Sequence, residues 1–562
     1  MPRITDIIAL QPLPDILADR IVLPPFFFAC RQKILIVADG SISFGTGGFA
    51  LSKVLHILEN NPEWWAKFEL TCAHRASDFA GNPVPTEAGG TRSIVENFRF
   101  TTASLAPYHQ VWLFGINLES TPSTPRANAT SYLETSELEA LARWMDGGGG
   151  LLAMGDHEDL GAGLCSEVPR VRSMRRWTNA QGVPPAGGES RHDTDVKGDD
   201  AFYQSSDQSD SHPMYITPKY YSLHSWSPFF RRRAPHPILC GTSGVIDILP
   251  DHPHEGWVYE DSEIDVTKNF SFGAYTNKPE YPTGAYQPKP EVIAWAHVQP
   301  DHTSVSDTFK GAADAKTFGA IGAYNGHDAN VGRVVVDSTW HHWFNVNLVG
   351  FGPVHPVSGM TATQARIANY FRNVALWLSP KTKIACMFQR ATWGSLFIYP
   401  LIEELHPRLP IWKLGEYARD AIGRRASQCT LINWIDILLP REIIEVFRPR
   451  KPLPDPCLTC PPFELLEIFT LGGIVRELLP LAQQALRDGK VADRAVAKAI
   501  AKGIAAGMSS LVEMQEQSVR DTQINVKKLR GALGKLSGEE TFIIKEDAPQ
   551  KNVAVKKGKA RR

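Results

Sequence analysis

Short apolar runs without polar alternation recur along the first 380 residues. They lie at 33–38, 68–72, 110–114 and 151–154. A run with no alternation predicts a strand that is buried on both faces, as in a parallel sheet. Between the runs, residues 48–59 and 135–145 carry apolar side chains at helical spacing, and the second of these segments ends in four glycines. Strands that alternate with helices predict right-handed βαβ units.

The same alternation resumes after an interruption. Residues 180–235 are rich in Gly, Ser, Asp and Pro, and we expect a long insertion there. Further strands are predicted at 292–296, 318–321 and 331–336, followed by a closing helix near 367–378. We therefore place one α/β domain at 33–380, preceded by an N-terminal leader at 1–32.

The last third of the chain has a different pattern. Residues 381–462 are Pro- and Arg-rich, which predicts a linker region with some helix. Residues 463–486 and 491–536 have amphipathic helical spacing, so we expect a helical hairpin over 463–536. We expect this hairpin to dock on the α/β domain or on another subunit. The expected partner of these helices is therefore a second copy of the chain, as a homo-oligomer, or another protein. The basic segment 537–562 is expected to be disordered.

Composition narrows the classes of protein. The 562 residues carry a net charge of −1, so no overall field attracts nucleic acid, which is an unlikely partner. No uninterrupted apolar segment reaches the roughly 18 residues that cross a bilayer, so we expect no membrane span. The eight cysteines show no disulfide-framework spacing, which fits a reducing, cytoplasmic location.

Polar side chains follow several predicted strands directly. Asp39 follows the first strand, residues 156–159 follow the fourth, and His341 and His342 follow the last. Ligands of open α/β sheets bind outside the carboxyl ends of the strands, so these side chains are expected to converge on one rim. Only one of the two histidines is expected to face it, because successive side chains on a strand point to opposite sides.

Residues 156–159 give the strongest chemical signal. Asp156, His157, Glu158 and Asp159 are four successive titratable groups. His157 is a candidate general base or metal ligand with Asp156 and Glu158 as partners, and a divalent metal held by His157, Asp156 and Asp159 is the one cofactor considered. The alternative is that His157 and one of the paired histidines only cap strand ends.

Three other segments offer ligand contacts. The glycine-rich loop 40–48, with Ser41, precedes a helix N-terminus and is a candidate for binding phosphate or sugar. His192 lies in the insertion and belongs either to a lid over the rim or to a self-solvating loop. His327 follows an Asn-Gly pair, which indicates a turn, and is also a candidate for the rim.

Four segments in order resemble the ThuA-like family of the class I glutamine amidotransferase-like superfamily. They are the strand at 33–38, the stretch LEALARWMDGGGGLLAMGDHE, residues 236–260 beginning HPILCG, and GRVVVDSTWHHW at 332–343. The resemblance implies a flavodoxin-like, doubly wound parallel sheet, here with a helical C-terminal extension, and a carbohydrate-related role. The superfamily's nucleophilic cysteine is missing from the turn at 154–158, and Cys165 lies beyond that turn, so glutaminase chemistry is not expected.

Three functions remain open on these residues. The first is a ThuA-like protein that binds or acts on a small polar, carbohydrate-like ligand at the rim. The second is a non-catalytic scaffold that uses the C-terminal helices for oligomerisation. The third is a metal-dependent hydrolase centred on the Asp-His-Glu-Asp run.

Overall fold

The structure is a computed structural model of the whole chain. It describes residues 29–76, 83–117, 133–156, 160–177, 213–223, 232–242, 244–250, 256–284, 287–298, 316–348, 360–398, 405–447, 461–488 and 491–538. Four candidates from the sequence lie outside these ranges: His157, Glu158, Asp159 and His192. Residues 1–28 of the expected leader also lie outside them.

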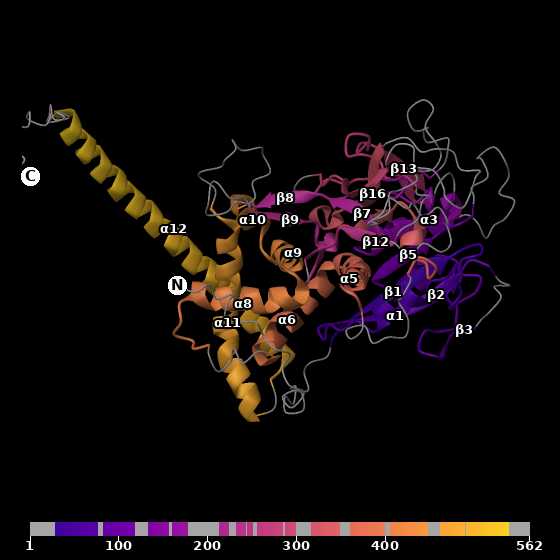
Figure 1. Ribbon diagram of the computed structural model, residues 1–562, viewed down its shortest axis with the longest axis horizontal. Coiled ribbons are helices and arrows are strands. Elements are labelled where there is room, and N and C mark those ends of the chain that lie inside the picture. Colours follow the sequence, from indigo (N-terminus) through magenta and orange to yellow (C-terminus); the bar gives the residue numbers. More distant parts are fainter. Residues whose placement is uncertain are drawn as a thin grey trace, which may run out of the picture. The chain divides into compact units, whose positions relative to one another are not determined.

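A nine-stranded mixed sheet forms the centre of the α/β part (Figure 1). Its order is β12-β7-β15-β16-β17-β6-β5-β1-β2. Five neighbouring strands are parallel: β2 (Ala66–His74), β1 (Cys30–Ala38), β5 (Gln110–Phe114), β6 (Gly150–Met154) and β17 (Val334–Asp337). The other four pair antiparallel: β16 (Lys316–Tyr324), β15 (Glu291–Val298), β7 (Pro213–Pro218) and β12 (Ile248–Pro250).

All seven strands predicted from apolar runs are present, but one of them, β16, runs opposite to the parallel strands. Strands β15 and β16 were expected to continue the parallel sheet, and instead β16 is antiparallel to both of its neighbours. The connection from β16 to β17, residues 325–333, contains only the 3-10 turn η5 (Gly326–Ala329). It is too short for the crossover helix that a parallel pair needs.

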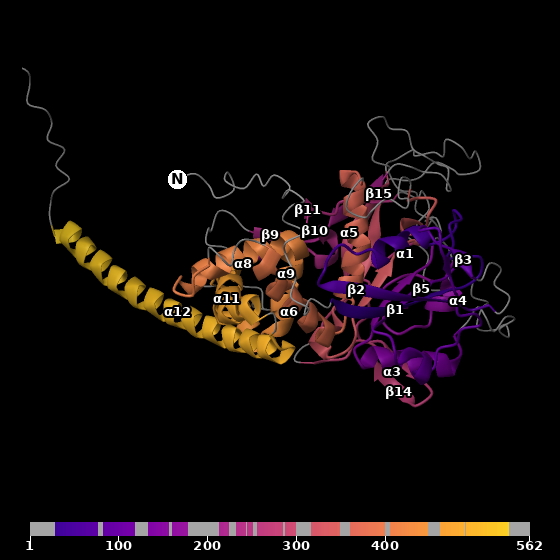
Figure 2. The ribbon, with the colours of Figure 1, turned by 90° about the horizontal axis from the view of Figure 1, so that it is seen from below.

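Helices cover both faces of the parallel strands (Figure 2). On one face, α3 (Thr135–Asp146) packs Leu138, Leu141 and Met145 against the strand side chains Leu35 and Val111. On the other face, the Trp112 ring meets Trp343, which packs on Phe371 of α5 (Ala362–Trp377). Short helices α1 (Ser52–Glu59), α2 (Thr102–Leu105) and α4 (Ala162–Cys165) complete the α/β part.

A buried ion pair fixes α3 to the end of β2. Glu137 accepts a hydrogen bond from Arg75 Nη2 at 3.0 Å and from the backbone N–H of Phe100 at 2.9 Å. It also closes a capping box with Glu134 at the helix N-terminus. Burial raises the pKa of Glu137, but the hydrogen bonds and charge of Arg75 outweigh it and hold the pKa below the usual value. The acidic first turn that the sequence predicts thus also anchors the helix.

Small strand pairs and turns surround the sheet. They are β3 (Val84–Pro85) with β4 (Thr91–Arg92), β8 (Tyr220–Leu223) with β9 (Arg232–Pro235), β10 (Cys240–Gly241) with β11 (Gly244–Val245), and β13 (Asn269–Phe272) with β14 (Tyr275–Pro279). Two further 3-10 turns are η4 (Pro237–Leu239) and η6 (Trp340–His342).

The C-terminal region is helical. Its helices are α6 (Lys381–Ile398), α8 (Ile411–Ala426), α9 (Gln428–Leu438), α10 (Arg441–Phe447), α11 (Phe463–Asp488) and α12 (Asp493–Gly538). Helices α11 and α12 approach closely at glycines, where a Cβ on Gly473 would meet Gly503 O and Gly507 N. Residues 1–508 form one compact unit and 509–562 a second, so α12 runs through the boundary between them.

Within the described residues, α12 is the one helix long and apolar enough to cross a membrane. Its segment 493–534 has an 18-residue window of mean hydropathy 1.3, and 28% of that window is buried. A single helix of this kind is weak support for a membrane span, because helices of soluble proteins pass the same test.

Two disulfides join the α/β part to the helical region. Cys30 of β1 pairs with Cys386 of α6, and Cys240 of β10 pairs with Cys429 of α9, with Cα–Cα distances of 6.1 and 6.0 Å. Cys72 and Cys165 are buried free thiols. The absence of a disulfide-framework spacing therefore does not translate into an absence of disulfides, because the paired cysteines are 356 and 189 residues apart.

Alkylation of the unfolded, unreduced protein tests these pairs. We expect Cys72 and Cys165 to be modified, and peptides linked through Cys30–Cys386 and Cys240–Cys429 to appear in the mass spectrum. Reduction should lower the free energy of unfolding by about 2–5 kcal/mol per bridge. Modification of all eight cysteines without reductant would instead support the reduced state that the sequence spacing favours.

The turns after β5 and β6 depend on glycine. Gly161 has φ +91°, and a Cβ there would lie 2.8 Å from Gly115 O and Gly155 Cα. We expect Gly161→Ala to destabilise the fold by at least about 2 kcal/mol in urea unfolding, because both the backbone conformation and the space are wrong. Gly47→Ala is the matched control, since a Cβ at Gly47 has nothing within 4 Å. Equal stability of the two variants would contradict the close packing of these turns.

Candidate functional site

The carboxyl ends of four parallel strands are level. Ala38, Phe114, Met154 and Asp337 are Cα partners across β1, β5, β6 and β17. The residues that follow them therefore emerge at one edge of the sheet. The order of the strands reverses between β1 and β5, and such a reversal opens a crevice at the carboxyl ends of α/β sheets.

Glycines allow the loops at this edge to come together. Gly40 has φ +56°, and a Cβ on it would overlap Ile116 and Asn117 of the loop after β5. A Cβ added to Gly115 would lie only 2.8 Å from Gly161 Cα. The loops after β5 and β6 thus pack backbone against backbone, and the backbone of the loop after β1 packs against side chains of the loop after β5.

Asp39 lies at the reversal point and is fully buried. Its Oδ1 accepts hydrogen bonds from the backbone N–H of Ile116 at 2.6 Å and of Asn117 at 3.2 Å. Its Oδ2 is buried and has no hydrogen-bond partner in the described part of the chain. Burial raises the pKa of Asp39 to about 6, and the two N–H groups and Arg75 only partly oppose this rise. A buried carboxylate oxygen without a partner is costly, so it marks a place for a ligand or a proton.

Asp156 and His341 meet between the turns that follow the neighbouring strands β6 and β17. His341 Nε2 lies 3.9 Å from Asp156 Oδ2, and both side chains are buried. His341 Nδ1 lies 3.0 Å from Asn347 Oδ1, an acceptor, so Nδ1 carries the hydrogen and Nε2 faces the carboxylate. The imidazole of His341 packs against two aromatic rings. Its ring centroid lies 4.2 Å from that of Trp340 and 5.9 Å from that of Phe49. The pair has the composition of an acid–base couple.

Arg175 ties the two turns of this pair together. Its Nη2 donates to the backbone oxygens of Asp156 at 2.8 Å and Ser338 at 2.6 Å, and its guanidinium lies 4.2 Å from the Trp177 ring centroid. Burial lowers its pKa to about 10, against the opposing charge of Asp156. Our reading of the sequence missed this residue. The run RVRSMRR at 170–176, unusually basic for a buried segment, was the available signal.

Cys165 is not a nucleophile in this arrangement. Its thiol is fully buried, and burial together with the nearby Asp39 raises its pKa far above the usual range. Reactive cysteines need the opposite, a thiolate favoured by positive surroundings. This agrees with the expectation drawn from its position beyond the turn.

Two sequence candidates lie elsewhere. His342 does not reach the rim, because its Nδ1 bonds Asp337 Oδ1 at 2.7 Å inside the fold, where Asp337 also accepts from Trp343 and Tyr370. His327 lies at the opposite edge of the sheet, because β16, which precedes it, runs antiparallel to β17. It is buried, and burial holds its pKa well below the usual value.

Ser41 is exposed, and the helix N-terminus that its loop precedes is already occupied. The backbone N–H of Lys53 in α1 donates to Asn345 Oδ1 at 3.0 Å. Asn345 Nδ2 in turn donates to the carbonyls of Gly45 and Gly47 at 3.1 and 2.8 Å. Asn345 thus links the loop 40–48 to the segment after β17 by hydrogen bonds. Fewer backbone N–H groups at the helix N-terminus remain for a phosphate than the sequence suggests.

Among the described residues, no three His, Cys, Asp or Glu side chains could hold a metal ion. Asp156 is the only member of the Asp-His-Glu-Asp run that the structure describes.

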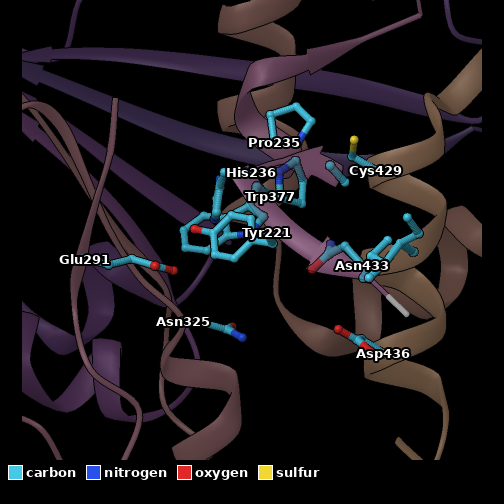
Figure 3. A pocket seen from close by; sticks show the side chains of 13 residues that line it. Tyr221, Pro235, His236, Glu291, Asn325, Trp377, Cys429, Asn433 and Asp436 are labelled. Atoms are coloured by element: carbon cyan, nitrogen blue, oxygen red, sulfur yellow. The ribbon is translucent and has the colours of Figure 1, made fainter. Parts of the chain in front are cut away.

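A hollow lies at the amino end of the parallel strands (Figure 3). This cavity of about 130 Å³ lies between α9, the β8–β9 hairpin and the end of α5. Buried Arg333 donates to Asn325 Oδ1 and Asn433 Oδ1, each at 2.8 Å, and lies over the Trp377 ring. The other lining residues include Tyr221, His236, Glu291, Cys429 and Asp436. His236, part of the resemblance, thus belongs to this cavity and not to the rim.

The titration of Asp39 is testable by unfolding at several pH values. Its folded pKa of about 6 lies above the usual unfolded value, so stability is fully present below about pH 4 and is lost as the pH rises through 6. We expect Asp39→Asn, which keeps an acceptor oxygen, to gain up to about 3 kcal/mol relative to the wild type between pH 4 and pH 7. A difference that does not change with pH would show that Asp39 titrates normally.

Comparisons with known proteins leave the family open. No protein-family model matches the chain, and no curated protein matches it. The solved structures to which the chain is similar include Cytoplasmic Protein STM3548 from Salmonella typhimurium, at 11% identity and a TM-score of 0.25. The alignment covers 62% of this chain and 100% of the other. A likeness of this size carries no argument, so the function rests on the geometry of the chain itself.

Proposed function

We propose that this chain is a ThuA-like protein that binds or acts on a small polar, hydroxyl-rich ligand at the carboxyl-end rim of its parallel strands. The observation that carries the proposal is Asp39, whose buried Oδ2 has no partner in the described part of the chain, at the point where the strand order reverses. Such a carboxylate is ready to accept a hydrogen bond from a ligand hydroxyl.

The strand order supports the fold that the proposal implies. Numbered along the chain, the five parallel strands have the order 2-1-3-4-5, which is the flavodoxin-like order. Three of the four segments that resemble the ThuA-like family fall on β1, on α3 with β6, and on β17 with the turn after it. A flavodoxin-like sheet of the class I glutamine amidotransferase-like type is therefore the finer fold that we propose.

The rim residues divide the chemistry between them. Asp39, with its pKa of about 6, accepts or releases a proton near neutral pH. The Asp156–His341 pair offers a second proton-exchanging position, with the hydrogen on Nδ1 held by Asn347. Arg175 binds no ligand in this scheme and positions Asp156 through its backbone carbonyl. Cys165 takes no part, because its thiol stays protonated.

Two other functions stay as alternatives. A metal-dependent hydrolase would use His157 and Asp159 with Asp156 to hold a divalent ion. A scaffold would need no ligand at the rim and would act through the C-terminal helices. A cytoplasmic location is likewise a prediction from the cysteine spacing, and the alkylation experiment described above tests it.

Thermal shifts with a panel of ligands separate these functions. The panel holds neutral mono- and disaccharides and sugar acids, each with and without Mg²⁺, Mn²⁺ or Zn²⁺. We expect at least one sugar to stabilise the wild type and to bind Asp39→Asn and His341→Gln at least tenfold more weakly, because each loses a rim contact. Asp436→Asn, in the cavity at the opposite edge, is the matched control and should bind normally.

The other outcomes identify the alternatives. A ligand lost in Asp436→Asn but kept in Asp39→Asn would move the site to the cavity and contradict the rim. Metal found by elemental analysis in the wild type and lost in His157→Ala would favour the hydrolase. No shift with any sugar or ion would favour the scaffold.

A further inference from the structure

The C-terminal part of α12 exposes an apolar stripe. Within residues 509–538, six large apolar side chains are between 41% and 63% exposed: Val512, Val519, Ile524, Val526, Leu529 and Leu533. Four of them, Val512, Val519, Val526 and Leu533, are spaced by seven residues. A spacing of seven keeps the side chains on one seam only if the helix winds around a partner helix.

The heptad assignment follows from this seam. With Val512, Val519, Val526 and Leu533 at position a, position d holds Gln515, Thr522 and Leu529. Position a is thus apolar throughout, and position d adds Leu529 to the seam. The sixth exposed apolar residue, Ile524, falls at position f and faces away from the seam.

The charges on the helix are segregated along its length. Acidic residues Glu513, Glu516 and Asp521 lie in the first part, and basic residues Lys527, Lys528 and Arg530 lie in the second. Arg520 is an exception, and its charge is partly used on its own helix, 3.7 Å from Glu516. A second copy in the reverse direction brings acidic against basic segments, and a second copy in the same direction does not.

The flanking positions give the register. Position e holds Glu516, Gln523 and Arg530. In an antiparallel pair, e faces e, so Glu516 of each copy meets Arg530 of the other when the two Gln523 residues face each other. The same register sets Val519 opposite Leu529 and Val526 opposite Thr522. In a parallel pair, the residues facing e would be Leu511, Ser518 and Asn525, none of which is charged.

We propose that two copies of this chain associate through an antiparallel, two-stranded coiled coil of residues 512–533. A lipid bilayer fits this segment less well, because seven charged residues lie between positions 513 and 530. The inference does not depend on the ligand site proposed above, which lies in the other unit of the chain.

Charge reversal in the full-length chain tests both the association and its direction. Sedimentation equilibrium should show a wild-type dimer. Glu516→Lys and Arg530→Glu should each weaken it roughly tenfold or more, since each homodimer then carries two like-charge contacts. An equimolar mixture of the two variants should restore dimers, because in the mixed pair Lys at 516 meets Glu at 530, and Arg530 meets Glu516.

Two further variants provide controls. Val519→Glu with Val526→Glu should yield monomer, while Ile524→Glu, equally exposed but off the seam, should leave the dimer unchanged. Circular dichroism should show that each variant keeps its helix content.

Several outcomes would overturn the inference. They are a monomeric wild type, a dimer that resists the seam variant, and charge variants that neither weaken alone nor restore each other. A monomeric wild type that binds vesicles of phosphatidylcholine and phosphatidylglycerol, with binding lost in the seam variant, would assign the stripe to a membrane surface.

Discussion

Charge buried at the strand tips constrains the rest of the α/β part. A carboxylate or guanidinium taken out of water must find partners, and here most of these partners are backbone groups of neighbouring turns. Arg175 binds two carbonyls from the turns after β6 and β17, and Asp39 binds two N–H groups from the loop after β5. Each pairing requires those turns to stay close, which is why glycines stand where they touch. Asp39 Oδ2 has no hydrogen-bond partner among the described residues, and this suggests a site.

The strands and main helices of the α/β part were predictable from the sequence, but the direction of β16 was not. The described part of residues 381–447, expected to belong to a linker region with some helix, forms the four helices α6, α8, α9 and α10. Buried strands leave a continuous apolar run whichever way they point, so β15 and β16 were found but their antiparallel pairing was not. Helix α3 was predictable to within one residue, because its periodicity and the following glycines agree. The cysteine pairs could not be found, because partners hundreds of residues apart leave no local pattern.

The site shows the same division. That only one of the two adjacent histidines would face the rim was expected from alternation along a strand, but the pair lies on a turn beyond the strand. The chain leaves the strand at Asp337 and makes a 3-10 turn, so His341 faces Asp156 while His342 turns inward to Asp337. Arg175 was missed because buried arginines are rare and its role depends on backbone carbonyls that carry no sequence signature.

The two disulfides have a consequence for a chain that is cut. One bridge encloses residues 31–385 and the other residues 241–428, so the two loops overlap. A single nick by a protease anywhere between residues 31 and 428 leaves both pieces covalently attached. The loops around the α/β part can therefore be cleaved without releasing a fragment, and such damage would be visible on a gel only after reduction.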